Sequence, residues 1–120
     1  MPVRHADEVP YQEIGAAEKT YIQFLIPPEE GPHFAMRRIT MKPGGGMPKH
    51  TNTVEHEQYV LQGRGEVAIG DTVYEVKPGD VMFIPAGVPH WYRNIGAEDF
   101  VFLCLVPNLP DEIRVLDDEA

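Results

Sequence analysis

Cysteine is almost missing from this chain, because Cys104 is the single thiol among 120 residues. A lone cysteine cannot form an intramolecular disulfide, so the fold must hold without covalent cross-links. The chain also lacks an apolar run of roughly 18 residues or more, which excludes a predicted transmembrane helix. Its first ten residues, MPVRHADEVP, lack the apolar segment of a signal peptide. Together these absences predict a soluble protein of the reducing cytoplasm.

Basic residues are also scarce. Lysine and arginine number 10 against 19 aspartates and glutamates, which gives a formal net charge of −9. Such an excess of negative charge opposes non-specific binding to nucleic acid and to anionic membranes. We therefore expect neither nucleic acid nor membrane among the partners.

Long helical segments are not expected. The chain has 12 prolines and 11 glycines spread over its whole length, a distribution that favours short strands closed by turns. A length of 120 residues with 42% hydrophobic content suits one core and gives no sign of a second. The composition predicts one all-β domain.

Runs of β-type residues predict the strands of a meander that a jelly roll or barrel can close. They lie at residues 20–26, 34–41, 58–61, 66–69, 72–76, 81–84 and 99–106. Alternation within 34–41 places Arg37 and Arg38 on opposite faces, but the sequence does not decide which faces inward or whether both are solvated. Residues 43–46, PGGG, predict a sharp break after this strand.

Polar side chains concentrate just after that break. His50, Asn52, Glu55, His56 and Glu57 fall within eight residues and lead directly into the strand-like run 58–61. Coordinating residues at the mouth of a buried strand are unusual in a core and typical of a metal site.

Two spaced motifs in this region resemble those of the cupin superfamily. The second motif has every fixed position filled, by Gly79, Pro85, Gly87, His90 and Asn94. The first motif has Gly44, His50 and Gly63 in place, but Asn52 stands where a second histidine is expected. The pattern is especially similar to small single-domain cupins with four-histidine sites. The resemblance covers about 34–106 and implies a double-stranded β-helix, or RmlC-like jelly roll, with an N-terminal arm and strand at 1–33 and a tail at 107–120.

The spacing of these residues has a physical reason. Alternation puts His50 and Asn52 on one face, and His56 joins them if the bend at Thr53 and Val54 preserves the register. With His90 from a neighbouring hairpin, three imidazoles converge and leave a position open, which is the arrangement of a catalytic metal site.

The identity of the remaining ligand has two readings. Counting along the family motif, Glu57 fits one spacer length and His56 the other, and the alternation favours His56. Asn52 either donates its amide oxygen or leaves its position to water. Neutral ligands leave the metal its full charge, which favours an anionic or enolisable substrate.

Four further residues are candidates for the pocket wall. Gln58 and Tyr92 follow His56 and His90 by two positions, so they share the inward face. For Phe102 and Cys104 the resemblance suggests the same face, although ordinary core packing explains them equally well. No motif places a base beside Cys104, so we interpret it as a buried thiol and not as a nucleophile.

The motifs favour a metal-dependent oxidoreductase of the dioxygenase type that acts on a small organic molecule. The expected cofactor is one divalent Mn, Fe, Ni, Cu or Zn ion per chain. A metal-dependent lyase or isomerase needs the same ligands, and a non-catalytic small-molecule-binding cupin is the third reading. We also expect a homodimer paired through the N-terminal strand region, because a small barrel of this kind leaves edge strands and an apolar sheet face exposed.

Overall fold

The computed structural model describes residues 2–116, which form strands over most of their length and no α-helix. The elements in chain order are the 3-10 helix η1 (Ala6–Glu8) and the strands β1 (Gln12–Glu13), β2 (Glu18–Ile26), β3 (Phe34–Asn52), β4 (His56–Gln62), β5 (Gly65–Ile69), β6 (Thr72–Val76), β7 (Val81–Ile84), β8 (His90–Asn94), β9 (Phe100–Pro107) and β10 (Ile113–Val115). The described part of the chain therefore has no helix with the length and apolar character that a membrane crossing requires.

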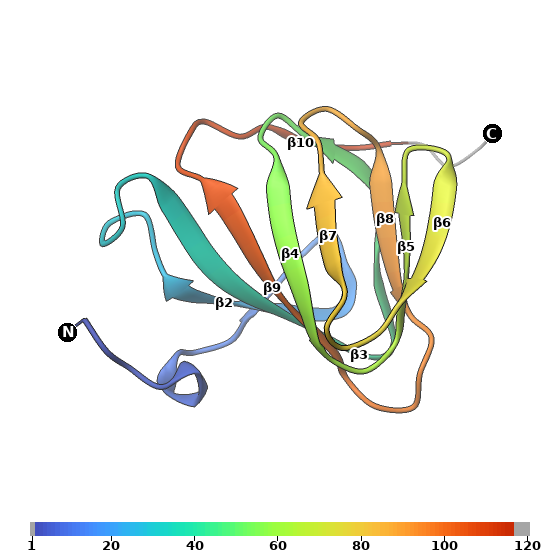
Figure 1. The fold of residues 1–120 in the computed structure, drawn as a ribbon, viewed down its shortest axis with the longest axis horizontal. Coiled ribbons are helices and arrows are strands. Elements are labelled where there is room, and N and C mark those ends of the chain that lie inside the picture. The colour runs from blue at the N-terminus through green and yellow to red at the C-terminus, as the bar shows by residue number, and fades with distance from the viewer. Residues whose placement is uncertain (1, 117–120) are drawn as a thin grey trace.

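The strands form one antiparallel sheet that curls around its own inner face (Figure 1). The main path runs β6-β5-β8-β3-β9-β4-β7, with β2 and β10 also paired to β3 and β1 paired to β2. This arrangement confirms the predicted all-β jelly roll. Curling gives the sheet a concave interior that can hold both a core and a pocket.

Strand β3 is the element that joins the two halves of the sheet. Its first part, residues 34–41, pairs with β9, and its second part pairs with β8 from Gly46 to His50. The predicted break at 43–46 is wrong, because the strand bends there and continues. Gly44 takes a positive φ of 83°, which lets the backbone bend at this point without the penalty that a side chain carries.

The core follows from strict alternation along the strands. On β9, Phe100, Phe102 and Cys104 are buried, while the residues between them are only partly buried. The buried cluster also includes Ile39, Met41, Val60, Val67, Val76, Met82 and Tyr92. Gly65 lies directly against the Phe100 ring, where a Cβ atom would come within 2.4 Å of ring carbons.

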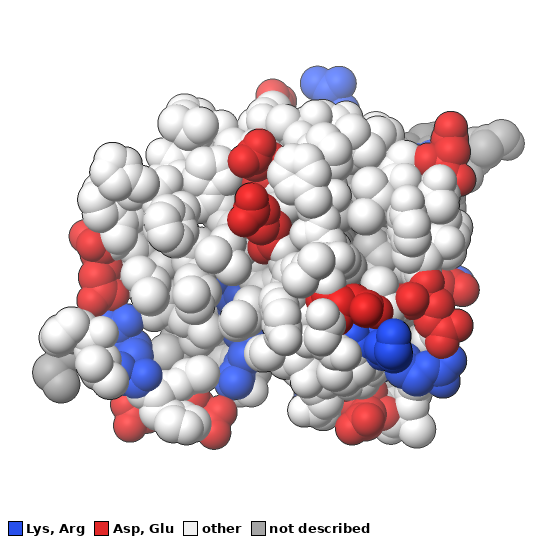
Figure 2. All heavy atoms as spheres, in the orientation of Figure 1, with Lys and Arg blue, Asp and Glu red and all other residues white. Residues whose placement is uncertain are grey.

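The outer face of β4 and β7 is apolar and uncovered. Tyr59, Leu61, Val81 and Phe83 are all exposed, and Val81 is 73% exposed. Tyr59 pairs directly with Val81 across the two strands. Figure 2 shows this side as largely uncharged, apart from acidic groups near the upper ends of the two strands.

Candidate functional site

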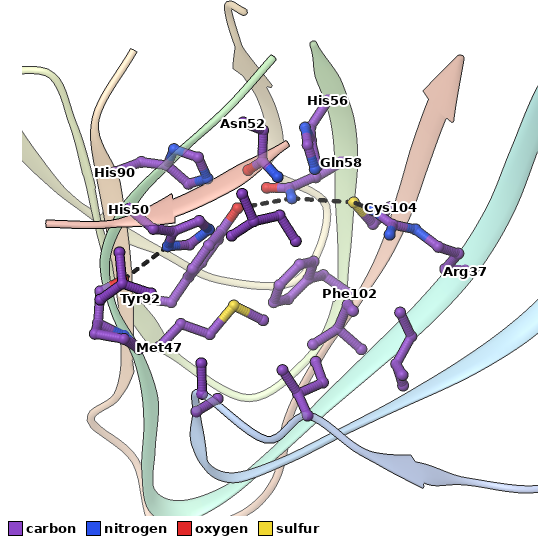
Figure 3. Close-up of a pocket in the computed structure, with 18 of the residues that line it drawn as sticks. Arg37, Met47, His50, Asn52, His56, Gln58, His90, Tyr92, Phe102 and Cys104 are labelled. Atoms are coloured by element: carbon purple, nitrogen blue, oxygen red, sulfur yellow. Dashed lines mark hydrogen bonds between the residues drawn. The ribbon is translucent and has the colours of Figure 1, made fainter. Parts of the chain in front are cut away.

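The three motif histidines lie at strand ends around one end of the barrel interior (Figure 3). His50 is near the end of β3, and His56 and His90 are the first residues of β4 and β8. His50 and His90 are directly paired across β3 and β8, with ring centroids 4.2 Å apart. The His56 ring lies 6.0 Å from that of His90. All three side chains are buried.

Each histidine is held by its own backbone in the same way. Nδ1 lies 2.7 Å from the Pro48 carbonyl oxygen in His50, 3.2 Å from that of Val54 in His56 and 2.9 Å from that of Val88 in His90. A carbonyl only accepts, so Nδ1 carries the proton in each ring and Nε2 keeps its lone pair. Nε2 is the nitrogen left free for a ligand.

Burial keeps two of these rings neutral. It lowers the pKa of His90 to about 4, an effect that the charge of His50 strengthens and the Val88 carbonyl opposes. Burial also lowers the pKa of His56 to about 4, and the positive charge of Arg37 adds to the effect. At neutral pH both rings therefore present a lone pair instead of a proton.

Asn52 is oriented by a residue that the sequence did not point to. Its Nδ2 donates to Oδ2 of Asp111 at 3.0 Å, and Oδ1 of the same carboxylate accepts from the Thr53 amide at 2.9 Å. With its NH2 group fixed in this way, Asn52 leaves Oδ1 buried and without a hydrogen-bond partner among residues 2–116. The segment that carries Asp111 leads into β10, which pairs with β3 at residues 50–52.

Glu57 does not share the face of these residues. Along β4 the side chains alternate, so His56, Gln58 and Val60 are buried while Glu57 and Tyr59 are exposed. Glu57 pairs with Phe83 and Leu105 on its two sides, in strands that likewise alternate. The bend before β4 thus brings His56, and not Glu57, to the cavity.

The three motif histidines do not form a complete metal-binding arrangement in this structure. Within residues 2–116, no group of three or more histidine, cysteine, aspartate or glutamate side chains has the arrangement needed to hold one ion. The donor atoms nevertheless suit a transition metal, because Nε2 of His90 and Oδ1 of Asn52 are both buried without partners among the described residues.

Next to the histidines, three of the predicted pocket residues form a small polar network, namely Gln58, Tyr92 and Cys104. Gln58 Nε2 donates to the Tyr92 hydroxyl at 2.8 Å and to Cys104 Sγ at 3.3 Å. Burial raises the pKa of Tyr92 far above its ordinary value, so the phenol keeps its proton. Phe102 stacks on the Tyr92 ring with centroids 5.2 Å apart. Gln58 Oε1 is buried and has no partner within residues 2–116.

Of the two arginines on β3, Arg37 is the one that faces inward. It lines the cavity and its Nη2 donates to Cys104 Sγ at 3.0 Å. Arg38 points to the opposite face, where it donates to Gln23 at 2.7 Å and to Asp7 at 3.1 Å.

One cavity of about 290 Å³ is lined by the three histidines together with Arg37, Asn52, Gln58, Tyr92, Phe102 and Cys104. Its remaining wall is mostly apolar and comes partly from the N-terminal arm, namely from Ile14, Ala16, Ala17, Ile22 and Phe24. Ile113 and Val115 of β10 close another side. No sequence pattern pointed to a role for residues 14–24 in the cavity wall, because that role arises only when β2 pairs with β3.

Comparison with known proteins identifies the fold family. A family model for the cupin domain matches residues 37–106. The chain is a cupin. Among solved structures, this cupin is similar to the polyketide cyclase RemF from Streptomyces resistomycificus, with a TM-score of 0.89 and 29% identity over 99% of this chain and 87% of that one. A cupin-2 domain protein from Rhodospirillum rubrum matches with a TM-score of 0.84 and 24% identity over 98% and 86%, a likeness that shows the fold alone.

Curated relatives match over shorter stretches. The cupin is 32% identical over 83 residues to 1-methylthio-D-xylulose 5-phosphate methylsulfurylase from Rhodospirillum rubrum, which is 64% of this chain and 53% of that enzyme. It is 40% identical over 52 residues to an uncharacterized protein from Methanocaldococcus jannaschii, which is 43% of this chain and 42% of that protein. The chain thus spans about half the length of these relatives.

Proposed function

We propose that this cupin binds one divalent transition-metal ion per chain through Nε2 of His50, His56 and His90, with Oδ1 of Asn52 as a weak fourth ligand. The observation that carries the proposal is the set of unpaired acceptors in the cavity. All three Nδ1 atoms are engaged by backbone carbonyls, and His90 Nε2 and Asn52 Oδ1 are buried without partners in the described part of the chain. Burying such acceptors is costly unless something occupies them.

The ligand set determines the kind of chemistry. Imidazole suits Zn, Cu, Fe and Ni, and a set without carboxylates leaves the ion its full charge. When bound, such an ion supplies a Lewis acid that polarises a carbonyl or enolate oxygen.

The protein itself contributes a hydroxyl hydrogen-bond donor and a dry environment. Tyr92 stays protonated because it is buried, and the Gln58 amide fixes the position of its hydroxyl oxygen. The largely apolar wall excludes water from the reacting groups. These features support a metal-dependent lyase, isomerase or cyclase that acts on an enolisable carbonyl compound. The similarity to the cyclase RemF over nearly the whole chain supports the same class.

A dioxygenase, the class that the motifs first suggested, is the second candidate. An amide oxygen is a weaker donor than imidazole, so the Asn52 position can yield to an incoming ligand. A site with neutral nitrogen ligands and open positions can take O2 and a substrate together.

Metal content tests the ligand set. Protein purified without added metal and then reconstituted at pH 7.5 is expected to hold about one ion per chain by elemental analysis. Mutating a residue that only hydrogen-bonds a metal ligand typically lowers metal affinity by roughly 10- to 100-fold, and His56→Ala, which removes a ligand itself, should lower it by at least as much. Glu57→Gln, on the outer face, should leave the affinity unchanged. A wild-type metal content far below one per chain, or the reverse order of the two variants, contradicts the proposal.

Deuterium incorporation tests the reaction class. Metal-loaded protein in D2O is expected to accelerate exchange at the carbon next to the carbonyl of 2-oxo acids such as phenylpyruvate, equally in air and under nitrogen. Tyr92→Phe should slow the exchange by roughly 10²-fold or more if the phenol is the proton donor. Oxygen consumption in step with substrate loss, and no exchange under nitrogen, supports the dioxygenase instead.

A further inference from the structure

Arg37 is the cavity residue that the proposed metal chemistry leaves unexplained. Its side chain lines the same cavity as the histidines, and its Nε is buried without a hydrogen-bond partner among residues 2–116. Among residues 2–116 its one hydrogen bond goes from Nη2 to the weak acceptor Sγ of Cys104, at 3.0 Å. A guanidinium is always charged, so this arrangement leaves a positive charge in a poorly hydrated place.

In the part of the chain that the structure describes, no negative group is paired with that charge. Within residues 2–116, no carboxylate forms an ion pair with Arg37 and no aspartate or glutamate lines the cavity. The positive charge of Arg37 also acts on His56, where it adds to the lowering of the pKa that burial causes. In a chain with a net charge of −9, a cation on a cavity wall without a carboxylate partner is unexpected, and it points to a binding role.

The neighbouring arginine shows the contrast. Arg38 has its Nε bonded to the Gln23 amide oxygen at 2.7 Å and its Nη2 bonded to Asp7 at 3.1 Å. The two arginines are adjacent on β3, so their backbone environments are nearly the same. Within residues 2–116, Arg38 therefore has a polar partner for Nε and a carboxylate for Nη2, whereas Arg37 has neither.

We infer that Arg37 is a substrate-binding residue that recognises the carboxylate of a monoanionic organic acid with an apolar body. This inference rests on the proposed function, because it takes the same cavity as the substrate site. A guanidinium presents its N–H groups as a planar fork that matches a carboxylate, and the unpaired Nε of Arg37 belongs to that fork. One guanidinium balances one negative charge. The wall formed by Ile22, Ile39 and Phe102 matches a hydrocarbon chain or ring. A cavity of about 290 Å³ limits that body to a small group.

Matched pairs of acids and amides test this inference directly. Hexanoate against hexanamide, and phenylacetate against phenylacetamide, differ in charge but hardly in shape. Protein-observed NMR titrations of the full chain, in metal-free and in zinc-loaded form, give the affinity ratio for each pair. We expect the acid to bind at least tenfold more tightly than its amide in both forms. Equal binding of acid and amide by the metal-free wild type overturns the inference.

Variants then assign the preference to Arg37. Arg37→Gln should reduce the ratio to about one, while the matched control Arg38→Gln should keep it at tenfold or more. Arg37→Lys, which keeps the charge but loses the fork, should give an intermediate ratio and serves if the glutamine variant does not fold. An unchanged ratio in a folded Arg37→Gln protein overturns the inference.

The two forms of the protein separate this inference from the metal proposal. A preference that depends on Arg37 in metal-free protein supports the inference even if the chain fails to bind metal. A preference that appears only with zinc and survives Arg37→Gln places the carboxylate on the metal, and overturns the inference while leaving the metal proposal intact.

Discussion

Acidification of the metal-free protein gives a sharp test of the buried histidines. His56 and His90 protonate near pH 6.5 in an unfolded chain but only at about pH 4 in the folded one. Above pH 6.5 both states are neutral, and these rings add nothing to the pH dependence. As the pH falls below 6.5 the unfolded state takes up protons that the folded state refuses, so the free energy of unfolding drops until the pH reaches about 4.

The magnitude follows from the same values. A pKa that falls from 6.5 to about 4 corresponds to about 3 kcal/mol for each ring. A small domain typically has about 5–15 kcal/mol of stability, so the two rings together account for a large share of it. The metal-free protein should therefore unfold on mild acidification, near pH 4 to 5.

Urea unfolding followed by Trp91 fluorescence, in the presence of a chelator, measures this loss from pH 7 to pH 4. Carboxylates titrate in the same range, so the informative quantity is the difference between wild type and His90→Gln, whose amide does not titrate. That difference should change by about 3 kcal/mol over the range. His5→Gln, which removes an exposed ring, is the matched control. Parallel curves for wild type and His90→Gln would refute the assignment of a neutral, buried His90.

Four further outcomes are expected. Asn52→His should tighten zinc binding by about tenfold or more in a competition titration, because imidazole is a stronger donor than an amide, and unchanged affinity means that residue 52 does not face the ion. Asp111→Ala should weaken zinc binding while Glu112→Ala does not, because Asp111 fixes the Asn52 amide; equal behaviour of the two variants contradicts that role. Gly65→Ala should cost about 1–3 kcal/mol in urea unfolding, because its Cβ would lie 2.4 Å from the buried Phe100 ring; a stability equal to wild type would show that the ring can move aside. Light scattering should report the homodimer expected through the N-terminal strand region at micromolar concentration, since a small barrel leaves edge strands and an apolar sheet face exposed, and a 13.5 kDa species excludes it.

The sequence predicted the barrel and the placement of the motif residues because both depend on local rules. Glycine and proline spacing marks the turns, and strand alternation sets which side chains share a face. Alternation also explains why the structure turns His56 toward the cavity and Glu57 toward solvent.

The rest depends on contacts between segments that are distant in the sequence. Alternation placed Arg37 and Arg38 on opposite faces but could not say which face was the inner one. The shared parity of Arg37 with the buried Ile39 and Met41 was a usable signal for that choice. Asp111 had no such signal, since its role depends on β10 pairing with β3.

The origin of the cavity walls has a consequence for divergence among cupins. The family pattern covers residues 37–106, yet part of the wall comes from Ile14 to Phe24 and part from Ile113 and Val115. The histidines can therefore stay constant while changes in the segments before and after residues 37–106 reshape the cavity that the histidines line. A cupin of this architecture can acquire a new substrate without any change within residues 37–106, and exchanging the two terminal segments between relatives is a direct route to altered specificity.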